Sequence, residues 1–203
     1  MYYAFDRRWL NSTVTVTLVA LNVVLYLASF FTGDLLHDLG VLDVDLVLQG
    51  EYRRLVTAVF LHADPAHLFS NMVLLFYIGG VVERNLGAMS YAALYLISGI
   101  AGNVMTVLYE VGHGQSWTSL GASGAVFGVM GAMLVLLFRV RDRIRGRSTL
   151  LPRVGFMVAY SLLAGFRGRG TNNIAHVCGL VTGCLICFLL TMDESRINVD
   201  ALL

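Results

Sequence analysis

Charged residues are unusually scarce in this sequence. Only 13% of its 203 residues are charged and 57% are hydrophobic, whereas an average soluble domain is about 25% charged. The shortage extends over the whole length, which indicates that lipid surrounds most of the chain. A net charge of +1 gives no sign of a nucleic-acid partner, so we expect none.

Lysine is absent, and cysteine is scarce. All 14 basic residues are arginine, and nothing in the sequence explains the missing lysine. The three cysteines, Cys178, Cys184 and Cys187, lie in the last apolar stretch, where an odd number predicts neither disulfides nor a zinc site. The sequence shows no obvious repeat or low-complexity segment, and we expect no appended soluble domain. We therefore expect one membrane-embedded domain over residues 1–203, with its core at 12–192.

The sequence contains several long apolar stretches. A helix needs about 20 apolar residues to cross the hydrocarbon, and six stretches come near this length. They are 13–31, 67–82, 89–109, 120–138, 151–166 and 172–192, of which the second and fifth are short and are expected to take up residues from their flanks. The first is too long for the apolar region of a signal peptide and lacks a small-residue cleavage site, so we expect a retained span. The fold class predicted is an all-α, six-helix polytopic membrane bundle.

The arginines predict an orientation through the excess of positive charge that cytoplasmic loops carry. With a cytoplasmic N-terminus, the inner side holds Arg7, Arg8, Arg84, Arg139, Arg141, Arg143, Arg145, Arg147, Arg153 and Arg196, and the outer side holds Arg53, Arg54, Arg167 and Arg169. The run 139–147 dominates, and we interpret it as a topological anchor near acidic lipid.

The first outer loop, residues 32–66, is unusually long. Aliphatic residues between 35 and 48 alternate there with Asp38, Asp43 and Asp45. This pattern predicts an amphipathic element that lies in the membrane interface. A loop of this length in a small domain usually has a function.

Ser123 is the first candidate for chemistry. It lies near the outer end of the fourth stretch, within the glycine-rich segment 121–131. Gly124 and Gly128 have the spacing that lets another helix backbone approach closely. Ser123 is either a nucleophile within reach of water or a serine that bonds its own helix backbone.

His176 lies at a similar depth in the sixth stretch. Gly179 and Gly183 share its helix face. If this face meets the face of Gly124 and Gly128, the imidazole comes within reach of the Ser123 hydroxyl and could activate it. The alternative is a histidine that only bridges two helices by a hydrogen bond.

His67 and Asn71 open the second stretch on the same outer side. Their spacing of four residues places both on one helix face, where their N–H groups could stabilise a developing oxyanion. The alternative is helix capping and a hydrogen bond between helices. His62 is expected to make a structural hydrogen bond. A metal site of His62, His67 and His176 has no supporting carboxylate or cysteine spacing, so neither a metal nor a cofactor is predicted.

Three motifs now stand in order at the outer ends of separate spans: His67-Leu-Phe-Ser-Asn71, Gly121-Ala-Ser-Gly124 and Ala175-His-x-x-Gly-x-x-x-Gly183. Gly79, Glu83 and Gly87 add a Gly-x-x-x-Glu-x-x-x-Gly pattern after the second span. The set resembles the rhomboid family of intramembrane serine proteases in its six-span basic form, over residues 12–192.

The resemblance implies a role for each site residue. Ser123 would be the nucleophile and His176 the general base and acid, as a dyad without a carboxylate. The predicted spans contain no acidic residue near their outer ends, which agrees with such a dyad. His67, Asn71 and the backbone N–H of Ser123 would form the oxyanion hole.

The resemblance also implies roles for two loops, and the sequence departs from the family pattern at two positions. The first loop would be a membrane-embedded hairpin, and the fifth span with the loop Arg167–Asn173 a movable substrate gate. Phe127 stands where many members have a tyrosine that packs on the catalytic histidine. Tyr52 precedes Arg53 where the family often has tryptophan.

The function expected is therefore an intramembrane serine endopeptidase that cleaves single-span transmembrane proteins near the outer face of the bilayer. We expect a multi-pass protein in contact with membrane lipid, in a prokaryotic inner membrane with a cytoplasmic N-terminus. The alternative is an inactive rhomboid-like protein that binds membrane clients. A small transporter is disfavoured because the polar groups cluster near one face and not at the midplane. The sequence predicts neither the substrate nor the oligomeric state.

Overall fold

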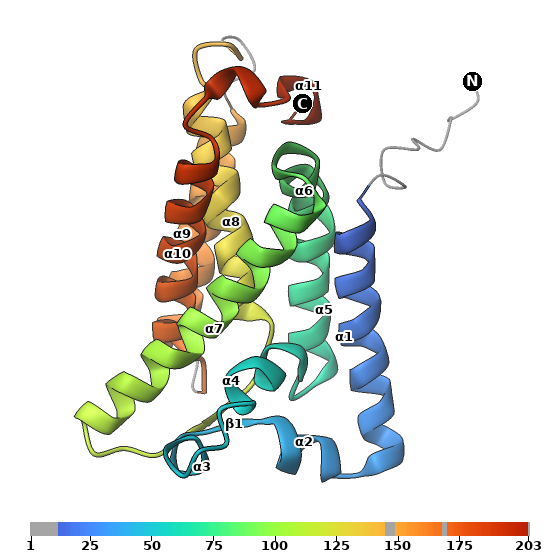
Figure 1. Cartoon of the computed structure of the whole chain (residues 1–203), viewed down its shortest axis with the longest axis vertical. Helices are drawn as coiled ribbons and strands as arrows, with labels where there is room; N and C mark the ends of the chain where they lie inside the picture. The colour runs from blue at the N-terminus through green and yellow to red at the C-terminus, as the bar shows by residue number, and fades with distance from the viewer. Residues whose placement is uncertain (1–11, 145–148, 168–169, 203) are drawn as a thin grey trace.

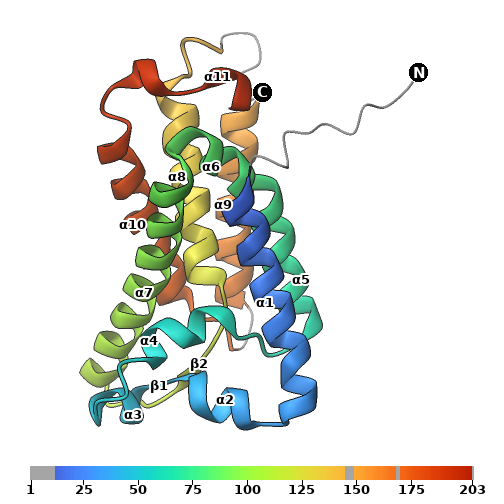
Figure 2. The same ribbon diagram turned by 45° about the vertical axis from the view of Figure 1, so that its right-hand side comes forward.

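A computed structural model describes residues 12–144, 149–167 and 170–202. Its long helical segments stand side by side in one bundle, with short elements across both ends (Figure 1). The segments are α1 (Thr13–Thr32), α5 (Pro65–Leu74) continued by the π-helical turn η3 (Leu75–Gly79) and α6 (Gly80–Leu86), α7 (Ala88–Gly112), α8 (Ser123–Arg139), α9 (Leu150–Arg167) and α10 (Asn173–Leu190). The predicted all-α, six-helix bundle is confirmed. Figure 2 shows α1 beside α5.

The lengths of two spans differ from the apolar stretches that predict them. The second takes up residues from both flanks, as expected, and the helical segment Pro65–Leu86 has 22 residues. Proline at its first position and the Asp64 carboxylate, which accepts a hydrogen bond from the His67 N–H at 2.8 Å, extend it beyond the apolar stretch. The fourth span, α8, is short instead, with 17 residues.

Helix α8 is short because protein surrounds it. It packs against α7, α9 and α10, and 12 of its 17 residues are buried. Non-helical backbone at membrane depth is tolerated where protein buries it, so an enclosed helix can be shorter than the hydrocarbon is thick. The segment before it stays extended up to Gly121, so that α8 begins at Ser123, below the end of the bundle.

The first loop crosses one end of the bundle, which we call the site end. It contains α2 (Leu35–Gly40), β1 (Leu42–Asp43), α3 (Val44–Leu48), α4 (Arg54–Thr57) and the 3-10 turn η2 (Ala58–Phe60). Strand β1 pairs antiparallel with β2 (Thr118–Ser119), which leads into α8. The buried Arg54 guanidinium donates to the backbone carbonyls of Val41 (2.9 Å) and Asp38 (2.7 Å). The loop is therefore a folded unit anchored to the segment that carries Ser123.

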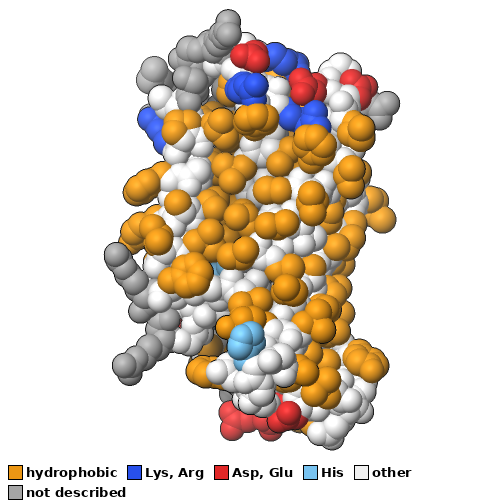
Figure 3. Space-filling view, turned by 90° about the vertical axis from the view of Figure 1, so that its left-hand side faces the viewer, with side chains coloured by type: hydrophobic (Ala, Val, Ile, Leu, Met, Phe, Trp, Pro, Cys, Tyr) orange, Lys and Arg blue, Asp and Glu red, His pale blue; other side chains and the backbone are white. Residues whose placement is uncertain are grey.

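The opposite end, which we call the arginine end, is closed by the 3-10 turn η4 (Glu194–Arg196) and α11 (Val199–Leu202). A broad hydrophobic belt separates the charged groups at the two ends (Figure 3). The described arginines at this end are Arg84, Arg139, Arg141, Arg143 and Arg153, against Arg53 and Arg54 at the site end. Arg7, Arg8, Arg145, Arg147 and Arg169 and the side chains of Arg167 and Arg196 lie outside the described part. The cytoplasmic N-terminus therefore stays a prediction.

Glu83 has a structural role at the arginine end. Its buried carboxylate accepts hydrogen bonds from the backbone N–H groups of Val14 (2.9 Å) and Thr15 (2.8 Å) and from the Thr15 hydroxyl (2.8 Å). It caps the first turn of α1, whose N–H groups have no partner within their own helix. At Gly79 a Cβ would collide with the Tyr91 hydroxyl. The Gly79/Glu83 pattern thus joins α6, α1 and α7.

Candidate active site

Ser123 and His176 meet in the structure. Ser123 is the first residue of α8, His176 lies in the first turn of α10, and the Ser123 Oγ is 2.8 Å from the His176 Nε2. A serine hydroxyl that donates to an unprotonated imidazole nitrogen has a base in place for its proton. Two residues 53 positions apart are thus joined by one hydrogen bond.

Glycines bring the two helices together, as the sequence predicts. A Cβ on Gly179 would overlap the carbonyl of Gly124, and a Cβ on Gly183 would overlap the carbonyl of Gly128. The α10 backbone therefore lies directly against the α8 backbone, one turn after another below the Ser123–His176 contact. At Gly128 itself a Cβ would meet the side chain of Ser98, so α7 joins the same contact.

The His176 ring is held by an aromatic neighbour. Phe127 stacks on it with ring centroids 4.4 Å apart and planes inclined by 21°. His176 is 8% exposed, and its buried Nδ1 has no hydrogen-bond partner within the described ranges. Phe127 thus occupies the place expected for it, over the imidazole.

One expectation about acidic residues is wrong. Helix α7 continues to Gly112, three residues past the predicted span, and it carries Glu110 at the site end. The Glu110 side chain is buried, lines the same cavity as Ser123, and accepts a hydrogen bond from the Trp117 N–H at 2.8 Å. A carboxylate therefore lines the cavity of the site. Its hydrogen bond to the Trp117 N–H holds the segment that leads into β2.

His67 and Asn71 line the cavity of about 800 Å³ that also contains Ser123 and His176. The His67 ring lies against Gly121, where a Cβ would be 2.6 Å from its Cε1 and 2.8 Å from its Nε2. Gly121 also has φ +138°, a conformation that favours glycine. This glycine lets His67 approach the backbone that leads to Ser123. All four predicted site residues therefore share one cavity.

His62 is closer to the site than the sequence suggests. Its ring is 1% exposed, and its Nε2 lies 3.2 Å from the Asn71 Nδ2. Burial of the ring, assisted by neighbouring His67, lowers the pKa of His62 to about 4, so Nε2 can accept a hydrogen bond from Asn71 at neutral pH. An amide nitrogen has two N–H groups. The bond to His62 therefore orients the Asn71 amide and leaves one N–H for another acceptor.

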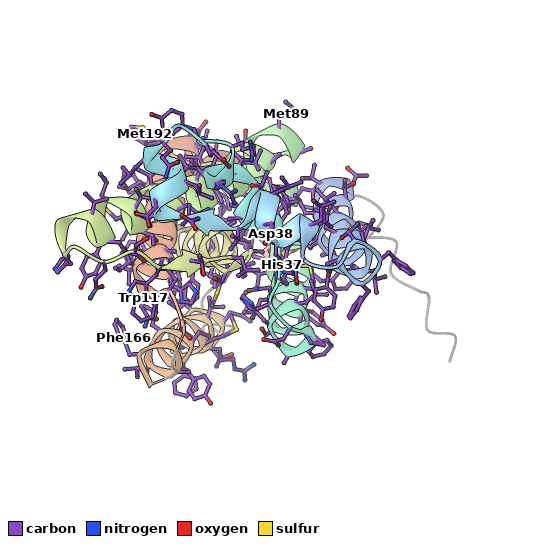
Figure 4. The ribbon with its side chains drawn as sticks, turned by 90° about the horizontal axis from the view of Figure 1, so that it is seen from below. His37, Asp38, Met89, Trp117, Phe166 and Met192 are labelled. Atoms are coloured by element: carbon purple, nitrogen blue, oxygen red, sulfur yellow. The ribbon has the colours of Figure 1, made fainter. Side chains whose placement is uncertain are left out.

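The cavity opens at the site end. It is lined by α5, α7, α8, the first turn of α10, Ser161 on α9, and the segments 115–121 and 170–172 that precede α8 and α10. Figure 4, seen from this end, places Trp117 and Phe166 on one side of the molecule, and both are more than half exposed. The predicted gate loop Arg167–Asn173 borders the cavity in its described part, whereas residues 168–169 lie outside the description. Within that description, no three His, Cys, Asp or Glu side chains gather as a metal site would require.

Comparison with known proteins adds the family. Residues 49–193 match the family model described as Rhomboid domain. RHOMBOID-like protein 5 of Arabidopsis thaliana is 36% identical over 157 residues, which cover 77% of this chain and 50% of that protein. Rhomboid protease GluP of Bacillus subtilis (strain 168) is 30% identical over 188 residues, covering 90% of this chain and 36% of GluP. Rhomboid protease AarA of Providencia stuartii is 27% identical over 212 residues, covering 92% and 75%. The chain spans half or less of the length of the Arabidopsis relatives that it matches.

Proposed function

Because the chain belongs to the rhomboid family, we propose that it is an intramembrane serine endopeptidase that cleaves single-span transmembrane proteins. The observation that carries the proposal is the 2.8 Å hydrogen bond between the Ser123 Oγ and the His176 Nε2. Two relatives named as rhomboid proteases, GluP and AarA, support the same reaction class.

The reaction proceeds by acyl transfer. The Ser123 Oγ attacks the carbonyl carbon of the scissile peptide bond while its proton passes to the His176 Nε2. The tetrahedral intermediate collapses, the C–N bond breaks, and His176 donates the proton to the departing amine. Water then attacks the acyl-enzyme with His176 as base, the proton returns through His176 to the Ser123 Oγ, and the carboxylic acid product leaves and loses its remaining proton to water.

The negative oxygen of the intermediate needs donors. Asn71 offers the amide N–H that its bond to His62 leaves free, and His67 lines the same cavity. Ser123 is the first residue of α8, where backbone N–H groups have no partner within the helix and the helix dipole favours negative charge. These groups are present before the substrate binds, which is what oxyanion stabilisation requires.

Phe127 takes over part of the function that a carboxylate has in a triad. Its stacking fixes the orientation of the His176 ring. The face of an aromatic ring attracts a cation within about 6 Å, so the imidazolium formed during the reaction is stabilised by the same contact. A dyad can then operate although the described residues offer the His176 Nδ1 no acceptor.

The substrate approaches as a membrane helix and must unwind, because a peptide bond inside a helix is shielded. Small residues and helix breakers are therefore expected at the cleaved position. Cleavage occurs near the face of the bilayer that the site end meets. With the N-terminus in the cytoplasm of a prokaryotic cell, this is the outer face of the inner membrane.

The test of catalysis uses the purified protein in liposomes with a fluorophosphonate probe and a model single-span substrate. Wild type is expected to bind the probe covalently and to cleave the substrate, and Ser123→Ala to do neither. If wild type neither labels nor cleaves above Ser123→Ala, the proposal is lost, and binding of membrane clients without cleavage takes its place.

Replacement of Asn71 tests the oxyanion hole. Asn71→Ala is expected to lower kcat by about 10²- to 10³-fold with little change in KM, the usual loss for one oxyanion donor. His62→Ala is expected to show a smaller loss of the same kind, because it only releases the amide. In the double variant the rate should equal that of Asn71→Ala. An additional loss there would show that His62 acts independently of Asn71.

A further inference from the structure

Asn172, the residue before α10, joins three segments through one amide group. Its Oδ1 accepts a hydrogen bond from the Ala175 N–H at 3.0 Å and so caps α10. Its Nδ2 donates to the Thr106 Oγ1 on α7 at 2.9 Å and to the Ser119 Oγ in β2 at 3.0 Å. Both N–H groups and the oxygen are thus engaged inside the protein.

The three segments are those that place the reacting groups. Ser119 lies four residues before Ser123, at the end of the strand that pairs with β1. His176 lies four residues after Asn172 and donates its backbone N–H to the Asn172 carbonyl at 3.3 Å. The amide of Asn172 therefore connects the chain entering the nucleophile helix to the chain entering the base helix.

Thr106 connects the same group to α7. Its hydroxyl also bonds the Gly102 carbonyl at 2.9 Å. At Gly102 a Cβ would lie 2.9 Å from the Ala175 carbonyl oxygen, so α7 directly contacts the first turn of α10 at this level. The Asn172–Thr106 bond thus holds the beginning of α10 against α7, which packs against both α8 and α10.

We propose that Asn172 is a positioning residue that sets the separation of the Ser123 Oγ and the His176 Nε2, an inference that rests on the proposed protease function. The contacts of Gly179 and Gly183 hold the two helices together along their length. The first turn of α10 lies at the end of this contact, before Gly179, so its backbone position also depends on the bonds that Asn172 makes to Thr106 and Ser119. A displacement of about 1 Å at a reacting group can cost about 10²-fold in rate.

Capping alone does not explain this residue. Serine caps helices about as well as asparagine, but its shorter side chain has one hydroxyl and does not reach two further partners. Asn172→Ser therefore keeps the cap and removes both bonds to Thr106 and Ser119. Asn198 serves as the matched control, because its Oδ1 caps α11 at the arginine end through the Ala201 N–H at 3.2 Å.

The experiment measures the fluorophosphonate labelling rate of Ser123, kcat and KM for a model substrate, and the midpoint of thermal unfolding. Asn172→Ser is expected to label and turn over about 10- to 100-fold more slowly, with KM and the midpoint close to wild type. Asn198→Ser should label at the wild-type rate. Ser119→Ala is expected to slow labelling less, and the Asn172→Ser/Ser119→Ala double variant to be no slower than Asn172→Ser.

The labelling rates distinguish failure of the proposed protease function from failure of the inference about Asn172. Wild type that does not label overturns the proposed function and this inference with it. Wild type that labels, beside an Asn172→Ser variant that labels equally fast, overturns the inference alone, and so does full additivity with Ser119→Ala. If Asn172→Ser does not fold, Ser119→Ala carries the test, and labelling at the wild-type rate in that variant overturns the inference.

Discussion

Replacement of His176 by alanine is expected to lower cleavage and fluorophosphonate labelling by about 10²- to 10⁴-fold, the usual contribution of a general base. This substitution removes the His176 Nε2, which is the acceptor for the Ser123 hydroxyl proton in the structure. Binding of the model substrate should persist, because the cavity is lined by several other elements. The measurements are steady-state cleavage in liposomes and the second-order rate of labelling.

The double variant gives the sharper measurement for His176. Residues that act as one unit are strongly non-additive, so Ser123→Ala/His176→Ala should cleave no more slowly than Ser123→Ala. His113→Ala is the control, since this exposed histidine stacks on Tyr109 at the end of α7. Rapid labelling of His176→Ala would show that another group takes the proton of Ser123.

Gly183→Ala is expected to reduce both stability and activity. The added Cβ would overlap the Gly128 carbonyl, so α10 must move away from α8 and carry His176 with it. Overpacking of a dense core costs about 1–3 kcal/mol, and the displacement of the base should reduce kcat by about 10²-fold. Thermal unfolding in detergent and cleavage in liposomes measure the two effects.

Gly155→Ala on α9 is the matched control for this substitution. A Cβ at that position meets no atom within 4 Å, so the same chemical change should leave the unfolding midpoint and kcat near wild type. If Gly183→Ala retains full activity, the close approach of α8 and α10 is not what holds Ser123 and His176 together.

Hydrophobicity marks where the spans lie along the chain but does not set where each helix ends. Apolar residues mark which parts of a chain lie at membrane depth, so the six stretches appear in the structure as helices. Their ends depend on capping and on neighbours. Asp64 extends the second span, and the enclosure of α8 by other helices permits a short fourth one.

The sequence by itself determined the membrane environment, the number of helices and the depth of Ser123, His176, His67 and Asn71, because depth follows from hydropathy and the position of a residue along its span. Only the tertiary structure decided which of these groups touch. The rotation of each helix about its axis depends on packing between helices, here on glycines that let backbones meet.

The same reason explains the partners that the sequence did not reveal. His62 reaches Asn71 because the short segment between η2 and α5 places its ring against the side of α5. Asn172 reaches Thr106 and Ser119 across 66 and 53 positions of sequence. A one-dimensional pattern records which residues are polar. The distances at which they meet arise only when the helices are packed in three dimensions.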